Sequence, residues 1–279
     1  MSLQNTTKPR PAFYPQAPRI ALGVEYNGYA FKGWQSQRSG VRTVQQCVEK
    51  ALSKVANQPI AVMCAGRTDT GVHGTEQVIH IETDIERSMY SWAFGANSQL
   101  PDDVSITWAC PMPGDFHARF SAIQRHYRYI ILNRKVRPAI KAGQVTWFYH
   151  DLDVTRMQAA AEHLLGRHDF SAYRAKGCQA KSPIRHISRL QVERFGETIH
   201  IEVSANAFLQ HMVRNIAGVL MTIGRGKAPP EWAKTVLETR NRSDGGITAS
   251  PHGLYLTGVD YPQPWQTLIE TARTGFWKT

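Results

Sequence analysis

The chain has 279 residues, which is enough for one large domain or two smaller ones. Hydrophobic residues make up 42% and charged residues 20%, as in ordinary globular proteins, and no run of eighteen apolar residues exists that could span a membrane. Lysine and arginine number 33 against 22 acidic residues, which gives a net charge of +11 and favours a polyanionic partner.

Residues 1–18 contain four prolines and no apolar segment, so we expect a mobile N-terminal tail and no signal peptide. The four cysteines of the chain are scattered without a C-x-x-C pair, which argues against a zinc site or a disulfide framework. We therefore expect free thiols in a cytoplasmic protein that binds no metal.

Residues 19–114 are expected to form an N-terminal α+β domain. Alternating apolar residues predict a strand over 20–26, and the T-V-Q-Q string that begins at Thr43 fits the capping box of a helix that runs to Val55. The remaining predicted elements are strands at 60–64 and 77–83, a helix at 90–98 and a strand at 104–110. Their order is β-α-β-β-α-β.

Residues 115–279 are expected to form a C-terminal α+β domain that repeats this order with basic, RNA-binding insertions. The predicted elements are a strand at 126–132, a helix capped by Asp153, strands at 187–193 and 198–203, a helix at 208–223 ended by Gly224, a helix after Pro229-Pro230 and a strand at 253–261. The fold prediction is α+β, with two ferredoxin-like or RRM-like units whose mostly antiparallel sheets flank a central basic cleft.

Acidic residues are missing from three long stretches, 116–150, 170–192 and 203–230, each of which carries several lysines or arginines. Aromatic residues are interleaved with these cations, as stacking on unpaired bases requires. This pattern favours a nucleic acid over other polyanions, and it makes Arg119 and Arg125 candidates for RNA contact.

The string CAGRTDTGVHG, residues 64–74, holds a single carboxylate, Asp69, in a glycine-rich loop with Arg67 two residues before it. D-T-G is also found in aspartic proteases, but those enzymes share one proton between two such carboxylates, and this chain has one D-T-G. A neighbouring arginine also keeps a carboxylate ionised, which opposes proton sharing. A carboxylate that merely caps a turn is the remaining alternative for the tripeptide alone.

The longer string GRTDTGVHG resembles the active-site motif of the TruA family of tRNA pseudouridine synthases. Four further blocks resemble that family in the same order and cover most of residues 19–261, namely YNGYAFKGWQSQ followed by TVQ, FHARFSAIQRHYRY, FLQHMVRNIAGVL and HGLYL. Five blocks in register form a specific signal. The string GGITASP, residues 245–251, departs from the more usual A-G-P-T-A-P-A of the family. The departure concerns the rigidity of one loop and not the chemistry.

The resemblance implies roles for individual residues. Asp69 would be the nucleophile, Arg214 its buried cationic partner, and Tyr127 the ring that stacks on the extruded uracil and handles protons. Arg67 would fill the gap left by the base, and Leu254 would form an apolar wall beside it. For Leu254 a core position is an equal alternative.

The resemblance also implies a cytoplasmic homodimer that acts without a cofactor on tRNA positions 38, 39 and 40, in the anticodon arm. Two alternatives stay open at this point: a non-catalytic RNA-binding protein with two RRM-like folds, and a pseudouridine synthase that acts on other uridines. The absence of an RNP1-like string from this sequence argues against the RNA-binding protein. That alternative would also leave the Asp69 carboxylate unexplained among cations.

Overall fold

The computed structural model describes residues 18–276, so the predicted tail 1–18 lies, apart from Pro18, outside the described residues. The strands are β1 (Arg19–Tyr26), β2 (Met63–Cys64), β3 (His73–Glu82), β4 (Val104–Met112), β5 (Gln124–Asn133), β6 (Thr146–Phe148), β7 (Gly166–Asp169), β8 (Ile184–Phe195), β9 (Thr198–Ala205) and β10 (Leu254–Asp260). The helices are α1 (Val44–Ala56), α2 (Met89–Asn97), α3 (Val154–Glu162), α4 (Met212–Gly224), α5 (Trp232–Thr239) and α6 (Trp265–Gly275). No helix within residues 18–276 is long and apolar enough to cross a bilayer.

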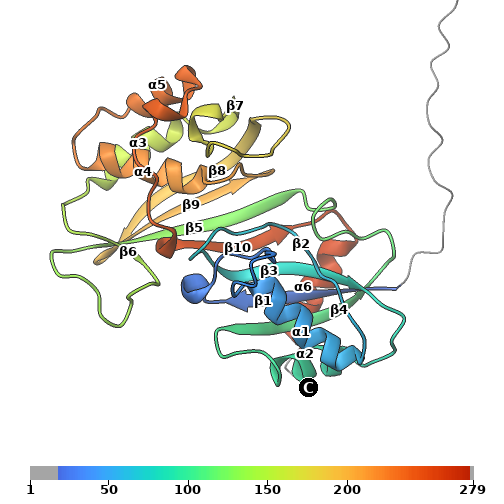
Figure 1. Ribbon diagram of the computed structural model, residues 1–279. Coiled ribbons are helices and arrows are strands. Elements are labelled where there is room, and N and C mark those ends of the chain that lie inside the picture. The colour runs from blue at the N-terminus through green and yellow to red at the C-terminus, as the bar shows by residue number, and fades with distance from the viewer. Residues whose placement is uncertain (1–17, 277–279) are drawn as a thin grey trace, which may run out of the picture.

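The strands form one continuous, mostly antiparallel sheet rather than the two separate sheets that the sequence predicted. The strand order is β4-β1-β3-β10-β5-β9-β8-β7, with β2 beside β3 and β6 beside β5 (Figure 1). The two halves join where β10 pairs in parallel with β3, Tyr255 opposite His73 and Leu256 opposite Gly74. The last strand of the second half is therefore also a structural strand of the first.

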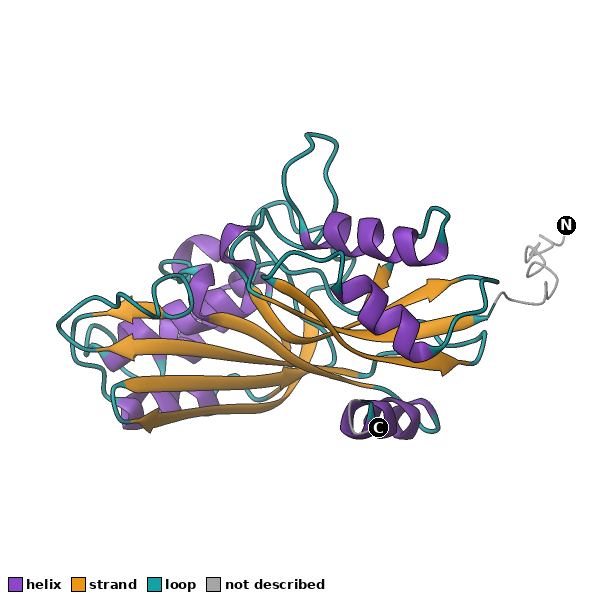
Figure 2. Ribbon diagram, turned by 90° about the horizontal axis from the view of Figure 1, so that it is seen from below, coloured by secondary structure: helices purple, strands orange, loops and turns teal. Residues whose placement is uncertain are grey.

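Helices cover the two halves of the sheet differently. In the first half, Leu22 and Val24 of β1 pack in one core with α1 and α2. Ala21 of the same strand packs in a second core, which includes Ile269 of α6. Figure 2 shows α6, beside the C-terminus, on the opposite side of the strands from α1 and α2. The helices α3, α4 and α5 gather over β8 and β9 at the other end of the molecule (Figure 1).

Most predicted elements are present, with corrections at their ends. The strand expected over 60–64 is reduced to Met63 and Cys64, while β3 starts four residues earlier than expected. Thr43 is the N-cap of α1, but its hydroxyl donates to the Gln46 side chain at 3.2 Å and caps no backbone N–H, so the predicted capping box is wrong. Asp153 does cap α3, because its carboxylate accepts from Arg156 N.

The helix predicted to begin at Phe208 begins four residues later, at Met212. His211, its N-cap, has φ of +62°, so the backbone turns sharply before the helix starts. Phe208 instead packs edge-on against the Tyr127 ring, with 5.0 Å between ring centroids. The short strands β6 and β7 and the C-terminal helix α6 were not predicted from the sequence.

Candidate active site

The loop between β2 and β3, residues 65–72, carries Asp69 and is held from several sides. The backbone of Thr68 accepts from Trp34 N at 3.0 Å, and its hydroxyl bonds to the Tyr26 hydroxyl at 2.8 Å. Gly71 has φ of +77° and lies against Pro251 and His252, so a side chain at this position would be strained. The loop is therefore a rigid support for the carboxylate.

Asp69 is 29% exposed and faces two side chains, the cationic Arg214 of α4 and the basic His211, which is the N-cap of that helix. Arg214 Nη1 lies 3.8 Å from Asp69 Oδ2, and His211 Nε2 lies 3.5 Å from the same oxygen. Arg214 is 14% exposed and donates from Nε to the carbonyl of Ala249 at 2.8 Å. The predicted pairing of Arg214 with Asp69, across 145 positions of sequence, therefore agrees with the geometry.

Burial lowers the pKa of Arg214, and the negative charge of Asp69 opposes that effect. An arginine nevertheless stays protonated in proteins, so the pair presents a fixed positive charge beside the carboxylate. The site therefore sets a permanent cation beside the Asp69 carboxylate, which is the candidate nucleophile.

Tyr127 lies on β5 with its hydroxyl directed at the Asp69 loop. A Cβ built on Gly66 would lie 3.7 Å from the Tyr127 oxygen, an ordinary van der Waals distance, so the hydroxyl lies directly beside this loop. Burial, followed by the charge of Asp69, raises the pKa of Tyr127 well above its ordinary value. The phenol is therefore neutral at physiological pH and can donate a hydrogen bond or a proton.

The other predicted residues surround this centre. Arg67 is exposed on the same loop, two residues from Asp69, while Leu254 is buried at the start of β10 opposite Tyr129. Arg119 is exposed, and its guanidinium lies 5.5 Å from the centroid of the Phe120 ring, which is itself exposed. Arg119 and Phe120 together present a cation and an aromatic ring on one loop.

Arg125 differs from the expectation of an RNA contact. Its guanidinium donates to four backbone carbonyls, those of Ala65, Arg119, Ala122 and Asn206. Ala65 begins the Asp69 loop, and Arg119 and Ala122 belong to the loop before β5. Arg125 therefore holds these segments together, and the four N–H groups of its two terminal nitrogens are bonded to the protein.

His211 was missed by the sequence reasoning. It lies inside the block FLQHMVRNIAGVL, where it appeared to be one residue of a longer helix. The imidazole reaches Asp69 only because α4 begins later than expected, at Met212, and because its N-cap has a positive φ. No local sequence signal marks that conformation, because a non-glycine residue rarely adopts it.

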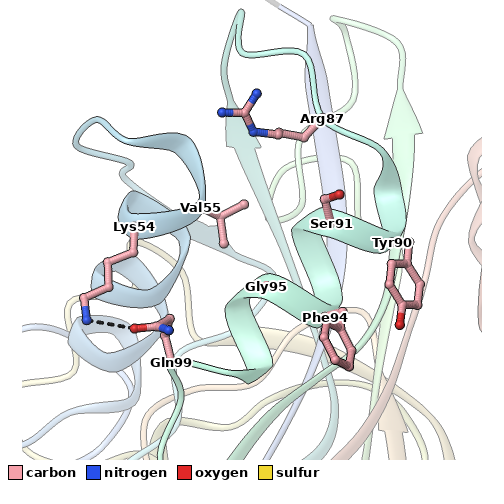
Figure 3. Close-up of a pocket in the computed structure, with 8 residues that line it drawn as sticks. All are labelled: Lys54, Val55, Arg87, Tyr90, Ser91, Phe94, Gly95 and Gln99. Atoms are coloured by element: carbon pink, nitrogen blue, oxygen red, sulfur yellow. Dashed lines mark hydrogen bonds between the residues drawn. The ribbon is translucent and has the colours of Figure 1, made fainter.

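No group of three His, Cys, Asp or Glu side chains that could hold a metal ion is found among the described residues. A separate hollow lies between α1 and α2, and the residues that line it are Lys54, Val55, Arg87, Tyr90, Ser91, Phe94, Gly95 and Gln99 (Figure 3). None of the predicted site residues belongs to it.

Comparison with known proteins gives a consistent result. A family model described as tRNA pseudouridine synthase matches residues 23–121 and 160–262. Proteins named tRNA pseudouridine synthase A are similar to this chain at 58% identity in Alcanivorax borkumensis, 59% in Nitrosococcus oceani and 54% in Pseudomonas aeruginosa. Each match covers 88% of this chain and, in the same order, 92%, 94% and 86% of the relative.

Among solved structures, a chain of the "Crystal Structure of a Cbf5-Nop10-Gar1 Complex" aligns over 72% of this chain and 45% of its own length. The identity is 14% and the TM-score is 0.32, which is too low a similarity to carry a structural argument.

Proposed function

The chain belongs to the tRNA pseudouridine synthase family, and from this premise we propose that it isomerises uridines 38, 39 and 40 of the tRNA anticodon arm, with Asp69 as the nucleophile. Pseudouridine synthesis breaks the bond between uracil N1 and ribose C1′, rotates the base and joins C1′ to C5, from which a proton leaves. Substrate and product are isomers, so the reaction needs no oxidant or reductant.

The observation that carries the proposal is a carboxylate held between two parts of the chain, beside a cation. Asp69 is fixed by its loop, and Arg214 lies 3.8 Å away on α4. An ionised carboxylate can attack C1′ directly or assist loss of the base to a glycal, and both routes begin with Asp69.

The surrounding residues have roles that fit this chemistry. The buried, neutral Tyr127 would stack on the uracil and handle the proton released from C5. A uridine must leave its helical stack to reach Asp69, which costs a few kcal/mol, and Arg67 would occupy the gap. Leu254 would form the apolar wall, and Arg119 with Phe120 would contact the RNA backbone and bases.

The proposal extends to the architecture. We assign residues 19–114 and 115–279 to two ferredoxin-like units, supported by the matching strand orders β4-β1-β3-β2 and β10-β5-β9-β8. We also expect a cytoplasmic homodimer, in which two basic clefts embrace one tRNA. Light scattering at several protein concentrations checks the dimer, since a monomer at all concentrations contradicts it.

The reaction is measured with tRNA carrying tritium at uracil C5, because joining C1′ to C5 expels that hydrogen into water. The wild-type protein should release tritium, Asp69→Asn should release none, and both should bind tRNA. Asp84→Asn, which alters an exposed carboxylate, is the matched control and should react as the wild type does.

Three outcomes would contradict parts of the proposal. Release by Asp69→Asn at the wild-type rate refutes the nucleophile. Tight binding without release by the wild type favours a non-catalytic RNA-binding protein. Continued release from a transcript with cytidine at positions 38, 39 and 40 places the reaction at other uridines.

A further inference from the structure

His211 has a backbone conformation that is unusual for its position. The described residues with positive φ other than glycine are Asn57, His211 and Arg240. Asn57 and Arg240 follow the C-terminal ends of α1 and α5, where this conformation is common. His211 is instead the N-cap of a helix, a position that is normally extended, as it is at α1, α2 and α3.

The side chain of His211 does not serve the helix that follows it. Its carbonyl accepts from Asn215 N at 2.9 Å, but the imidazole caps no backbone N–H of α4. The positive φ instead turns the imidazole toward Asp69, where Nε2 lies 3.5 Å from Oδ2. Strained residues of this kind concentrate at functional sites, where the surrounding structure holds them in place.

His211 and Arg214 approach the same carboxylate oxygen. Arg214 Nη1 is the more distant of the two, at 3.8 Å from Oδ2, and Arg214 Nε is occupied by the carbonyl of Ala249. Two donors on one oxygen fix the rotation of a carboxylate more firmly than one donor does. They also leave the second oxygen, Oδ1, as the one to be presented to a substrate.

We infer that His211 is a positioning residue of the reaction: its neutral imidazole donates from Nε2 to Asp69 Oδ2 and orients Oδ1 toward ribose C1′. This inference rests on the proposed function, because it acts through Asp69. The present separation of 3.5 Å is long for a hydrogen bond and tightens when RNA fills the site, as is common for catalytic hydrogen bonds.

The protonation state of His211 follows from the charges that face it. Burial lowers its pKa, Asp69 opposes this effect, and Arg214 and Arg242 add to it. The imidazole is therefore neutral at pH 7. As the pH falls, an imidazolium would form beside Oδ2 and draw charge from the nucleophile, so the rate should fall on the acid side.

The test uses two substitutions at one position. His211→Gly relieves the backbone at positive φ and removes the donor, so the variant should fold at least as stably as the wild type. We expect its kcat for tritium release to fall tenfold or more, with KM for tRNA within about twofold of wild type. His211→Gln keeps an amide N–H where Nε2 was but cannot titrate, so it should retain most of kcat and extend activity to lower pH.

Asn57→Gly is the matched control, because it relieves positive φ at the exposed C-terminal end of α1, outside the loop that carries Asp69. It should gain stability as His211→Gly does and keep the wild-type rate. Wild-type kcat in His211→Gly at every pH overturns the inference. Equal losses in the Gly and Gln variants, with an unchanged pH profile, overturn it as well.

Asp69→Asn in the same assay distinguishes a failure of the proposed nucleophile from a failure of the role proposed for His211. If Asp69→Asn is inactive and His211→Gly is fully active, only the inference about His211 fails. If Asp69→Asn is fully active, the proposed nucleophile fails, and the inference fails with it.

Discussion

Acidification should destabilise the fold through His80, a residue to which the sequence assigned no role. His80 lies on β3, is 2% exposed and accepts a hydrogen bond at Nδ1 from Ala118 N, 3.2 Å away. Burial, followed by electrostatic interactions with His117 and Arg19, lowers the pKa of His80 from 6.5 to about 4. Protonation at Nδ1 would also break the bond to Ala118, at the base of the loop that carries Arg119.

The direction in which the free energy of unfolding changes with pH follows from the protonation of His80 in the unfolded and native chains. Unfolded His80 takes up a proton as the pH falls through 6.5, whereas the native residue stays neutral until about pH 4. The stability that depends on a neutral His80 is fully present above pH 6.5 and is lost as the pH falls below that value. With about 1.4 kcal/mol for each tenfold difference in proton affinity, His80 alone should cost about 2 kcal/mol between pH 7 and pH 5.

Urea unfolding at pH 7 and pH 5 measures this loss, with His80→Asn as the test variant. The asparagine Oδ1 can accept from Ala118 N as the imidazole Nδ1 does, but it does not titrate. We expect the variant to be less stable at pH 7, because it leaves a cavity, and to lose about 2 kcal/mol less than wild type on acidification.

His186→Asn is the matched control, since His186 is exposed on β8, and it should lose as much stability on acidification as the wild type. If His80→Asn and wild type lose the same free energy between pH 7 and pH 5, the assignment of the acid sensitivity to His80 is refuted.

Three further predictions concern packing, loop attachment and RNA binding. Gly28→Ala would place a Cβ 1.9 Å from the Val72 carbonyl, so its melting temperature should fall by about 5 °C or more, whereas Gly275→Ala, with open space around it, should not destabilise. Arg125→Met leaves four carbonyls without their donor, so it should lower the free energy of unfolding by about 3 kcal/mol and speed amide hydrogen exchange in the Asp69 loop. Unchanged exchange would contradict the role of Arg125 in holding that loop. Affinity for tRNA should fall at least tenfold between 50 and 200 mM salt in a filter-binding assay, because phosphate contacts release counterions, and a flat response would contradict binding through the basic surface.

Local patterns predicted most of the fold because many elements are amphipathic. Ile20, Leu22 and Val24 alternate on β1 and are all buried in one core, and Asp153 caps α3 as its sequence indicated. The apolar spacing that begins at Phe208 was misleading. Phe208 packs against Tyr127 outside the helix, although its spacing fits the helical pattern of α4.

Long-range pairing could not be read from the chain. Leu256 and Gly74 are neighbours in a short parallel ladder of two residue pairs, and nothing in either strand specifies that partner. The same limit applies to Arg125, whose position in a basic stretch favoured an RNA contact. Its four acceptors come from four backbone positions, and a sequence does not show where carbonyls converge.

The sequence predicted the pairing of Asp69 with Arg214, but it did not predict the approach of His211 to the same carboxylate. The motif strings placed Asp69 with Arg214, and the two side chains do lie together. His211 escaped because its approach to Asp69 depends on one unusual backbone angle rather than on a residue pattern. Residue types in a motif thus indicate which chemistry is present, while the backbone decides which neighbour completes it.

The position of β10 in the middle of the sheet has a consequence for synthesis on the ribosome. Asp69 is made early, but β10, which pairs with both β3 and β5, is made only after residue 253. Contacts of such large sequence separation form late and slowly, and the growing chain exposes unpaired strand edges until then. A nascent chain would therefore lack the junction between the two halves of the sheet until residues 254–260 have been made, which delays any reaction with RNA until the sheet is continuous.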